Sequence, residues 1–224
     1  MISILIPLFN GVEFLEQSVS SVLNQTYTDW EIIIGVNGHP ENSTVYQTAK
    51  KYEEQNYKIR VLDLHAITEP GKANALNEMV GYCKYDYVAI LDVDDVWFPE
   101  KLEIQSIYIT DFKYDVVGTR CVYFGDMENV IPTIPIGDIS NVNFKNVNPI
   151  INSSSVIRKS LCRWNNKENG VEDYDLWLRL RYERPNTSFF NCNDILVKHR
   201  IHKASAFNSK GNHTKVSDLL AKYA

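Results

Sequence analysis

The sequence predicts an α/β protein with a mostly parallel central sheet and helices on both of its faces. Two observations carry this prediction. Short β-branched runs alternate with amphipathic helical patterns through the first half of the chain, and no linker, repeat or low-complexity tract divides its 224 residues. That length suits one domain with a sizeable core, so we expect a single domain over residues 1–224.

The alternation begins at the N-terminus. Ile2 to Ile6 is a compact apolar run that stops at Pro7, and apolar residues recur at helical spacing from Val12 to Leu23. Further apolar runs bounded by turn residues predict three more strands, at Glu31 to Val36, Ile59 to Leu64 and Tyr87 to Leu91. Helical patterns predict helices at Ser43 to Gln55, Ala73 to Cys83 and Pro99 to Ile107.

The second half is less regular. Apolar runs predict β structure at Val116 to Phe124, Val130 to Ile134, Ser153 to Arg158 and Phe189 to His202. Helical spacing over Glu172 to Tyr182 predicts one helix, whereas the Asn-rich segment from Ile136 to Val147 is expected to be a loop. Ligands of parallel α/β sheets collect at the carboxyl ends of the strands, so the site is expected where the first-half strands end.

Composition excludes several classes of protein. The 23 Lys and Arg against 28 Asp and Glu give a net charge of −5, so no general attraction to nucleic acid is expected. The four cysteines are widely spaced and are expected to be reduced: Cys83, Cys121, Cys162 and Cys192. No signal peptide, membrane anchor or transmembrane segment is visible, so we expect a soluble protein whose compartment the sequence leaves unknown.

An acidic triplet follows the predicted strand that starts at Tyr87. Asp92, Asp94 and Asp95 crowd three carboxylates into four positions, which costs repulsion unless a cation offsets it. Oxygen ligands of this kind favour Mn²⁺ or Mg²⁺, which can bridge a carboxylate to a diphosphate. The alternative is that Asp94 or Asp95 only caps the turn into the next helix.

A second acidic cluster, Glu172 and Asp173, opens the late helix. Carboxylates in a first helical turn are favoured by the helix dipole alone, which is the structural alternative. A carboxylate beside the aromatic ring of Trp177 can instead have a raised pKa and act as a base, while Trp177 either walls a binding site or packs in the core.

Missing motifs narrow the field. The chain has no dinucleotide-binding GxGxxG, no phosphate-binding GxxxxGK[ST], no GxSxG elbow and no HExxH. Dehydrogenases, P-loop nucleotidases, serine hydrolases and zinc proteases of these types are therefore excluded.

Four ordered segments together resemble the inverting family-two glycosyltransferases of the GT-A fold, a Rossmann-like architecture. The segments are SILIPLFNGVEFLEQSVSSVLNQTYTDWEIIIGVNG (Ser3 to Gly38), GKANALN (Gly71 to Asn77), YVAILDVDDVWFPEKLE (Tyr87 to Glu103) and EDYDLWLRL (Glu172 to Leu180). The resemblance implies that residues 1–110 form a nucleotide-sugar-binding half and residues 111–224 an acceptor-binding half.

The resemblance assigns a nucleoside pocket to the end of the first strand. Pro7, Phe9 and Asn10 would line it, and Asn37 falls where the family usually has an Asp that contacts uracil. The chain departs from the family's turn here. An Asn side chain still offers an acceptor to uracil N3–H and a donor to O4, so the departure weakens the base assignment without cancelling it.

The resemblance also distributes roles around the acidic triplet. Asp92 would contact nucleoside or sugar hydroxyls with its neighbour Val93, Asp94 would bind the metal, and Asp95 would be structural. Lys72 would face a phosphate or the base, with a solvated lysine as the alternative.

The late motifs supply the remaining candidates. Asp173 would be the general base, with Glu172 as its rival, and His202 would complete the metal shell unless it is an ordinary surface histidine. The charges of Arg200 and Lys203 could neutralise a departing diphosphate.

Together these features predict a Mn²⁺- or Mg²⁺-dependent enzyme that transfers a hexose from a UDP-sugar, with inversion. Glucose and galactose are the favoured sugars, and the acceptor hydroxyl belongs to a glycan, a protein or a lipid. A sugar nucleotidyltransferase is disfavoured because the first turn, Pro7 to Asn10, lacks a glycine-rich basic loop. The alternative is a non-catalytic glycan-binding or scaffold module built on a decayed transferase fold.

Overall fold

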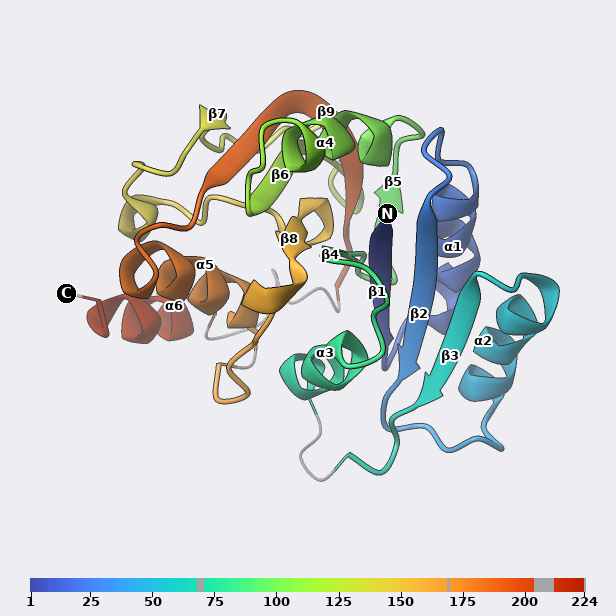
Figure 1. Ribbon diagram of the computed structural model, residues 1–224. Coiled ribbons are helices and arrows are strands. Elements are labelled where there is room, and N and C mark those ends of the chain that lie inside the picture. The colour runs from blue at the N-terminus through green and yellow to red at the C-terminus, as the bar shows by residue number, and fades with distance from the viewer. Residues whose placement is uncertain (68–70, 169, 204–211, 224) are drawn as a thin grey trace.

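The computed structural model describes residues 1–67, 71–168, 170–203 and 212–223 (Figure 1). The strands in these residues are β1 (Ile2–Leu8), β2 (Trp30–Val36), β3 (Ile59–Asp63), β4 (Tyr87–Ile90), β5 (Val96–Trp97), β6 (Val116–Gly125), β7 (Gly137–Asp138), β8 (Val156–Arg158) and β9 (Phe189–Ile201). The α-helices are α1 (Leu15–Leu23), α2 (Thr44–Gln55), α3 (Lys72–Val80), α4 (Lys101–Thr110), α5 (Glu172–Glu183) and α6 (Asn212–Ala221). Short 3₁₀ helices are η1 (Val12–Phe14), η2 (Phe144–Asn146), η3 (Asn152–Ser154) and η4 (Lys159–Leu161).

The strands form one sheet in the order β3-β2-β1-β4-β8-β6-β9-β5, with β7 paired to β9 beside this path. Strands β1 to β4 run parallel, with β1 between β2 and β4 and β3 outside β2. Their carboxyl ends therefore meet at one edge of the sheet, where Leu8 is in register with Val36. Every residue of β2 is buried, as expected of a strand covered on both faces.

The second half extends this sheet and returns to the first half. Strand β8 is antiparallel to both β4 and β6, and the long strand β9 runs parallel to β6. Near its end β9 pairs antiparallel with β5, where Lys198 is in register with Val96. This pairing brings the residues that follow Lys198 next to the acidic triplet that precedes β5.

Helices cover both faces of the sheet, as the sequence predicts (Figure 1). One apolar cluster joins alternate residues of β1, such as Ile4 and Ile6, to α1, α2 and α4. The other joins Leu5 of β1 and Ile33 of β2 to α3, α5 and α6. The alternation along β1 follows the strand period of two, which places successive side chains on opposite faces. The α/β fold class is confirmed.

The structure corrects one predicted strand. Residues 130–134 form no strand, because the segment turns sharply at Asn129 (φ 60°) and contains Pro132, with Pro135 directly after it. Prolines have no N–H to donate to a sheet ladder. The short strand β5 and helix α6 had no prediction, whereas the four cysteines are free as expected. None of the described helices is long and apolar enough to cross a membrane.

Candidate active site

A cavity of about 640 Å³ opens where β1, β2 and β4 end, beside the start of α3 and the end of β9. We call it the strand-end cavity. Each residue that the sequence predicted to hold nucleotide or metal lines it: Pro7, Phe9, Asn10, Asn37, Lys72, Asp92, Val93, Asp94 and His202. The two candidate bases, Glu172 and Asp173, do not line it but lie next to it through Lys72. The cavity therefore draws on both halves of the chain.

An exposed aromatic ring stands at the mouth of this cavity. Phe9 is 53% exposed, and its ring packs over Gly38, where an added Cβ would lie 2.5 Å from the ring. Gly38 has φ +73°, a conformation that glycine adopts without a steric penalty. The Nε2 atom of His39 lies 2.5 Å from the Phe9 carbonyl oxygen, which ties the turn after β2 to the turn after β1. The result is a fixed flat surface next to the buried Asn37.

Asp92 is held by groups from two separate segments, the start of α3 and η3. Its Oδ1 is 2.5 Å from Lys72 Nζ, and the amide of Asn152 donates to both carboxylate oxygens at 3.1 Å. The Asp92 backbone N–H donates to Ser153 Oγ at 3.0 Å. Burial raises the pKa of Asp92, but Lys72 and Asn152 lower it more, so the pKa lies below its usual value. Asp92 is therefore an ionised acceptor at neutral pH.

Lys72 connects the two acidic motifs. Besides its contact with Asp92, its Nζ lies 3.9 Å from Glu172 Oε1. Burial alone would lower the pKa of Lys72, yet Asp92 and Glu172 hold that pKa above its usual value. Lys72 therefore carries a fixed positive charge between the motifs and is no solvated surface lysine.

The other two carboxylates of the triplet meet residues from the end of β9. Asp94 Oδ2 lies 3.0 Å from His202 Nε2, and the fully buried Asp95 lies 2.9 Å from His199 Nδ1. Asp95 also accepts from the backbone N–H of Arg200, whose guanidinium donates to the Asp94 carbonyl oxygen. Burial lowers the pKa of His199, but Asp95 outweighs it and raises the pKa to about 9. Asp95 therefore fixes the end of β9 against the triplet.

Asp94 and His202 form a pair that suits a divalent cation. Burial raises the pKa of Asp94, and the neighbouring carboxylates of Asp95 and Asp92 raise it further. Such crowding favours a bound cation. No group of three or more His, Cys, Asp or Glu side chains within the described ranges is arranged to hold a metal. Two protein ligands nevertheless fit Mn²⁺ or Mg²⁺, which usually keep waters and substrate phosphates in the remaining positions.

The two acids at the start of α5 have different environments. Glu172 is buried, and its Oε2 accepts from the Gly170 N–H at 2.6 Å, so it closes the turn before the helix. The Asp173 carboxylate faces the backbone N–H of Tyr174, which lowers its pKa, and it bonds to no other side chain among the described residues. Burial, followed by the charge of Glu172, raises the pKa of Asp173 to about 6. Trp177 is fully buried and donates to the Ile150 carbonyl, so it packs in the core and walls no binding site.

The sequence places this site in a known family. A sequence model described as "Glycosyl transferase family 2" matches residues 3–169. The chain is also 32% identical over 220 residues to the O-antigen biosynthesis glycosyltransferase WbnJ of Escherichia coli, covering 93% of this chain and 83% of that protein. The chain belongs to glycosyltransferase family 2. A second relative of this glycosyltransferase is UDP-Glc:alpha-D-GlcNAc-diphosphoundecaprenol beta-1,3-glucosyltransferase WfgD of Escherichia coli, 26% identical over 94% of this chain and 81% of that protein.

Solved structures agree on the fold of the glycosyltransferase. Residues 1–349 of S. aureus TarS in complex with UDP-GlcNAc match with a TM-score of 0.72 and 15% identity, over 99% of this chain and 65% of that one. The mannosyltransferase PcManGT from Pyrobaculum calidifontis, in complex with GDP-Man and Mn²⁺, matches with a TM-score of 0.73 and 15% identity, over 99% and 63%. The chain thus has the GT-A fold and spans less than two thirds of these solved chains.

The sequence did not predict the residues that hydrogen-bond to the acidic triplet from the second half of the chain. Asn152 and Ser153 belong to η3, which sits against the end of β4 because β8 pairs with β4. The only signal was the polar run Asn152 to Ser155, most of which lies inside the strand predicted at Ser153 to Arg158. In the structure the strand starts only at Val156, and the polar run forms η3 beside the end of β4. The Asp95–His199 pair, separated by 104 positions, was missed for the same reason.

Proposed function

We propose that this glycosyltransferase transfers a hexose from a UDP-sugar to an acceptor hydroxyl, with inversion at the anomeric carbon and with Mn²⁺ or Mg²⁺ bound. The observation that carries the proposal is the meeting of the two acidic motifs at Lys72, beside the strand-end cavity. Glucose and galactose are the favoured sugars. The WfgD relative, whose name gives UDP-Glc as donor, supports this choice.

The nucleotide would lie along the ends of β1 and β2. The exposed ring of Phe9 offers a stacking surface for the base, and Pro7 and Asn10 line the wall beside it. Asn37 would then present its amide to the base edge, accepting from uracil N3–H and donating to O4. Asp92, kept ionised by Lys72, would accept hydrogen bonds from hydroxyl groups of the ribose or sugar.

Asp94 and His202 would hold the divalent cation. When bound, such a cation neutralises charge on a diphosphate leaving group. Lys72 and the guanidinium of Arg200 line the same cavity and would add positive charge on the protein side.

Asp173 would take the proton of the acceptor hydroxyl. A general base works best when its pKa lies near the working pH, and the pKa of Asp173 is raised to about 6. Glu172 is the weaker candidate, because its carboxylate accepts from the Gly170 N–H and faces Lys72. The acceptor hydroxyl would belong to a glycan, a protein or a lipid and would approach over residues 111–224.

Two measurements test this proposal. Calorimetry with UDP, GDP and CMP, each with and without Mn²⁺, should rank UDP first and show tighter binding with the metal. A ranking with GDP first would contradict the nucleotide assignment. UDP release from UDP-glucose and UDP-galactose should then rise when an acceptor is added, whereas a glycan-binding module would release no UDP under either condition.

A further inference from the structure

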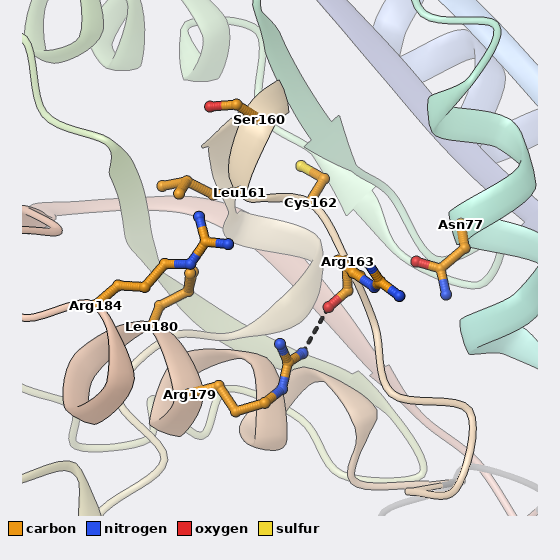
Figure 2. A pocket seen from close by; sticks show the side chains of 8 residues that line it. All are labelled: Asn77, Ser160, Leu161, Cys162, Arg163, Arg179, Leu180 and Arg184. Carbon is orange, nitrogen blue, oxygen red and sulfur yellow. Dashed lines mark hydrogen bonds between the residues drawn. The ribbon is translucent and has the colours of Figure 1, made fainter.

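A second cavity, of about 490 Å³, lies on the other side of α3 from the strand-end cavity. Its walls come from the end of α5, the segment that follows β8, and Asn77 of α3 (Figure 2). The two cavities share no lining residue, because α3 turns Lys72 and Ala75 toward one and Asn77 toward the other. Three arginines line the second cavity, and we call it the arginine groove: Arg163, Arg179 and Arg184.

The positive charge of the groove is only partly neutralised. Arg179 Nε lies 2.6 Å from Asp175 Oδ2, so this charge is paired. Within the part of the chain that the structure describes, the guanidinium groups of Arg163 and Arg184 have no hydrogen-bond or ion-pair partner, and no carboxylate lines the groove. Asp115 lines an adjoining cavity with Arg184, but its carboxylate is bound to Arg158 at 2.6 Å. Two uncompensated cations thus line one groove of a chain whose net charge is −5.

The backbone that carries Arg163 is held on two sides. Arg179 Nη2 donates to the Arg163 carbonyl oxygen at 2.5 Å, a bond that Figure 2 shows. The Asn77 side chain donates to the Trp164 carbonyl at 2.8 Å and accepts from the Trp164 N–H at 2.9 Å. Because the loop is fixed before any ligand arrives, binding costs less ordering entropy.

A neighbouring cavity of about 310 Å³ continues the groove past Trp164 and shares Asn77, Arg163 and Arg179 with it. The Trp164 side chain is 3% exposed, and its indole N–H is buried without a hydrogen-bond partner among the described residues. A buried donor left unpaired costs free energy.

We propose that the arginine groove is a binding site for a phosphoryl anion, a phosphate or diphosphate group held by Arg163 and Arg184. The planar guanidinium fork matches phosphate oxygens and can bind two of them at once. Leu161 and Leu180 line the same groove, so the group that carries the phosphoryl anion meets apolar surface beside the charges. The inference does not rest on the proposed transferase chemistry, because the groove shares no residue with the strand-end cavity.

Calorimetry with inorganic diphosphate, in buffer without divalent cations, tests the site. We expect Arg163→Ala and Arg184→Ala each to weaken binding about tenfold, since each removes a charge-assisted hydrogen-bond donor. The matched control is Arg60→Ala, which removes an exposed arginine of β3 at the far end of the sheet and should leave the affinity unchanged. Both groove arginines are exposed, so the variants are expected to fold, and unfolding midpoints check this.

The result that overturns the proposal is a wild-type protein that does not bind diphosphate, or an Arg60→Ala variant that loses as much affinity as the groove variants. Arg163→Lys adds a geometric check, because it keeps the charge and loses the fork. Its affinity should fall between those of wild type and Arg163→Ala, and an affinity equal to wild type would contradict a bidentate contact.

A second arm identifies what carries the anion. Sedimentation with phosphatidylcholine vesicles that contain phosphatidic acid, compared with vesicles of phosphatidylcholine alone, asks whether the groove takes a lipid-borne phosphate. Binding to the acidic vesicles that the Arg163→Ala, Arg184→Ala double variant loses assigns a lipid headgroup. Diphosphate binding without vesicle binding assigns a soluble phosphate compound, and vesicle binding that the double variant keeps counts against the groove.

Discussion

Two acidic motifs meet at Lys72, and the contacts of their carboxylates follow the same arrangement. Each contains three carboxylates, Asp92, Asp94 and Asp95 at the end of β4 and Glu172, Asp173 and Asp175 at the start of α5. In each motif one carboxylate is buried and paired with a cationic side chain, as Asp95 is with His199 and Asp175 with Arg179. In each motif a second carboxylate, Asp92 or Glu172, faces Lys72.

The third members differ, and the difference fits the two roles proposed for them, cation binding and proton transfer. The pKa of Asp94 is raised by burial and by two neighbouring carboxylates, and its oxygen faces the imidazole of His202. The pKa of Asp173 is raised by burial and by Glu172, and none of the histidines in the described ranges contacts it. A carboxylate crowded by like charges beside a nitrogen ligand suits a cation, whereas a buried carboxylate without a side-chain partner suits a base.

The largest effect is expected at Asp173. Asp173→Asn keeps the size of the side chain but removes the basic site, so kcat should fall by about 10² to 10⁴ while donor affinity stays within a factor of two or so. Glu172→Gln is the matched control, and its loss should be clearly smaller. The measurement is steady-state kinetics, with donor affinity determined separately. An active Asp173→Asn variant together with an inactive Glu172→Gln variant would assign the base to Glu172 instead.

Stability should separate the two paired carboxylates. Asp95→Asn weakens two contacts of a buried carboxylate, with His199 and with the Arg200 N–H, and should lower the free energy of unfolding by about 3 kcal/mol. Asp175→Asn weakens a similarly buried ion pair with Arg179 and should cost less, about 1 kcal/mol. Urea unfolding measures both. The pKa of His199 is raised to about 9, so its contribution is complete below its unfolded value near 6.5 and is lost as the pH rises through 9. The gap between wild type and Asp95→Asn should therefore narrow above pH 9, and a gap independent of pH would contradict the pairing.

Asp94 should matter for nucleotide binding only when metal is present. Asp94→Ala removes one of two proposed ligands, so Mn²⁺ should no longer tighten UDP binding, a loss of about tenfold or more relative to wild type. Glu13→Ala is the control, because Glu13 is an exposed carboxylate that lines the same cavity. Calorimetry of UDP with and without Mn²⁺ is the measurement. If Asp94→Ala keeps the wild-type dependence on metal, Asp94 only bonds His202.

The smallest expected effect is a shift in pH dependence. The base must be ionised, so kcat should rise with pH through a midpoint near 6, the raised pKa of Asp173. Glu172→Gln removes a like charge that helps to raise this pKa, and the acidic limb should move to lower pH by a fraction of a unit. A limb that stays in place in Glu172→Gln would mean that the measured midpoint belongs to another group.

How much of the structure can be predicted from the sequence depends on how far apart in the chain the contacting residues lie. The strands and helices of the first half were predicted within a few residues, because each is a short apolar run or a helical repeat bounded by turn residues such as Gly38. The predicted stop at Pro7 was wrong, since β1 continues through Pro7 to Leu8. The residues of the strand-end cavity followed, since parallel strand ends converge at one edge. Their roles stay predictions.

The supports of the site could not be read in the same way. Asn152 and His199 reach the acidic triplet only because β8 pairs with β4 and β9 returns to β5, and neither pairing leaves a local pattern. The arginine groove is hidden for the same reason, because Arg163 and Arg184 are separated by 21 positions and look like ordinary surface charges. The strand wrongly predicted at 130–134 shows that a local pattern can also mislead. An apolar run does not form a strand when Pro132 lies inside it and Pro135 follows it.

The return of β9 has a consequence for how such proteins can diversify. His199, Arg200 and His202 come from the second half of the chain but line the cavity built by the first half. An exchange of residues 111–224 as one block, by recombination or in a designed chimera, would replace part of the proposed nucleotide site together with the proposed acceptor side. An exchange meant to change only the acceptor would have to stop before Phe189. Strand β9 would then stay in the same chain as the β5 strand with which it pairs.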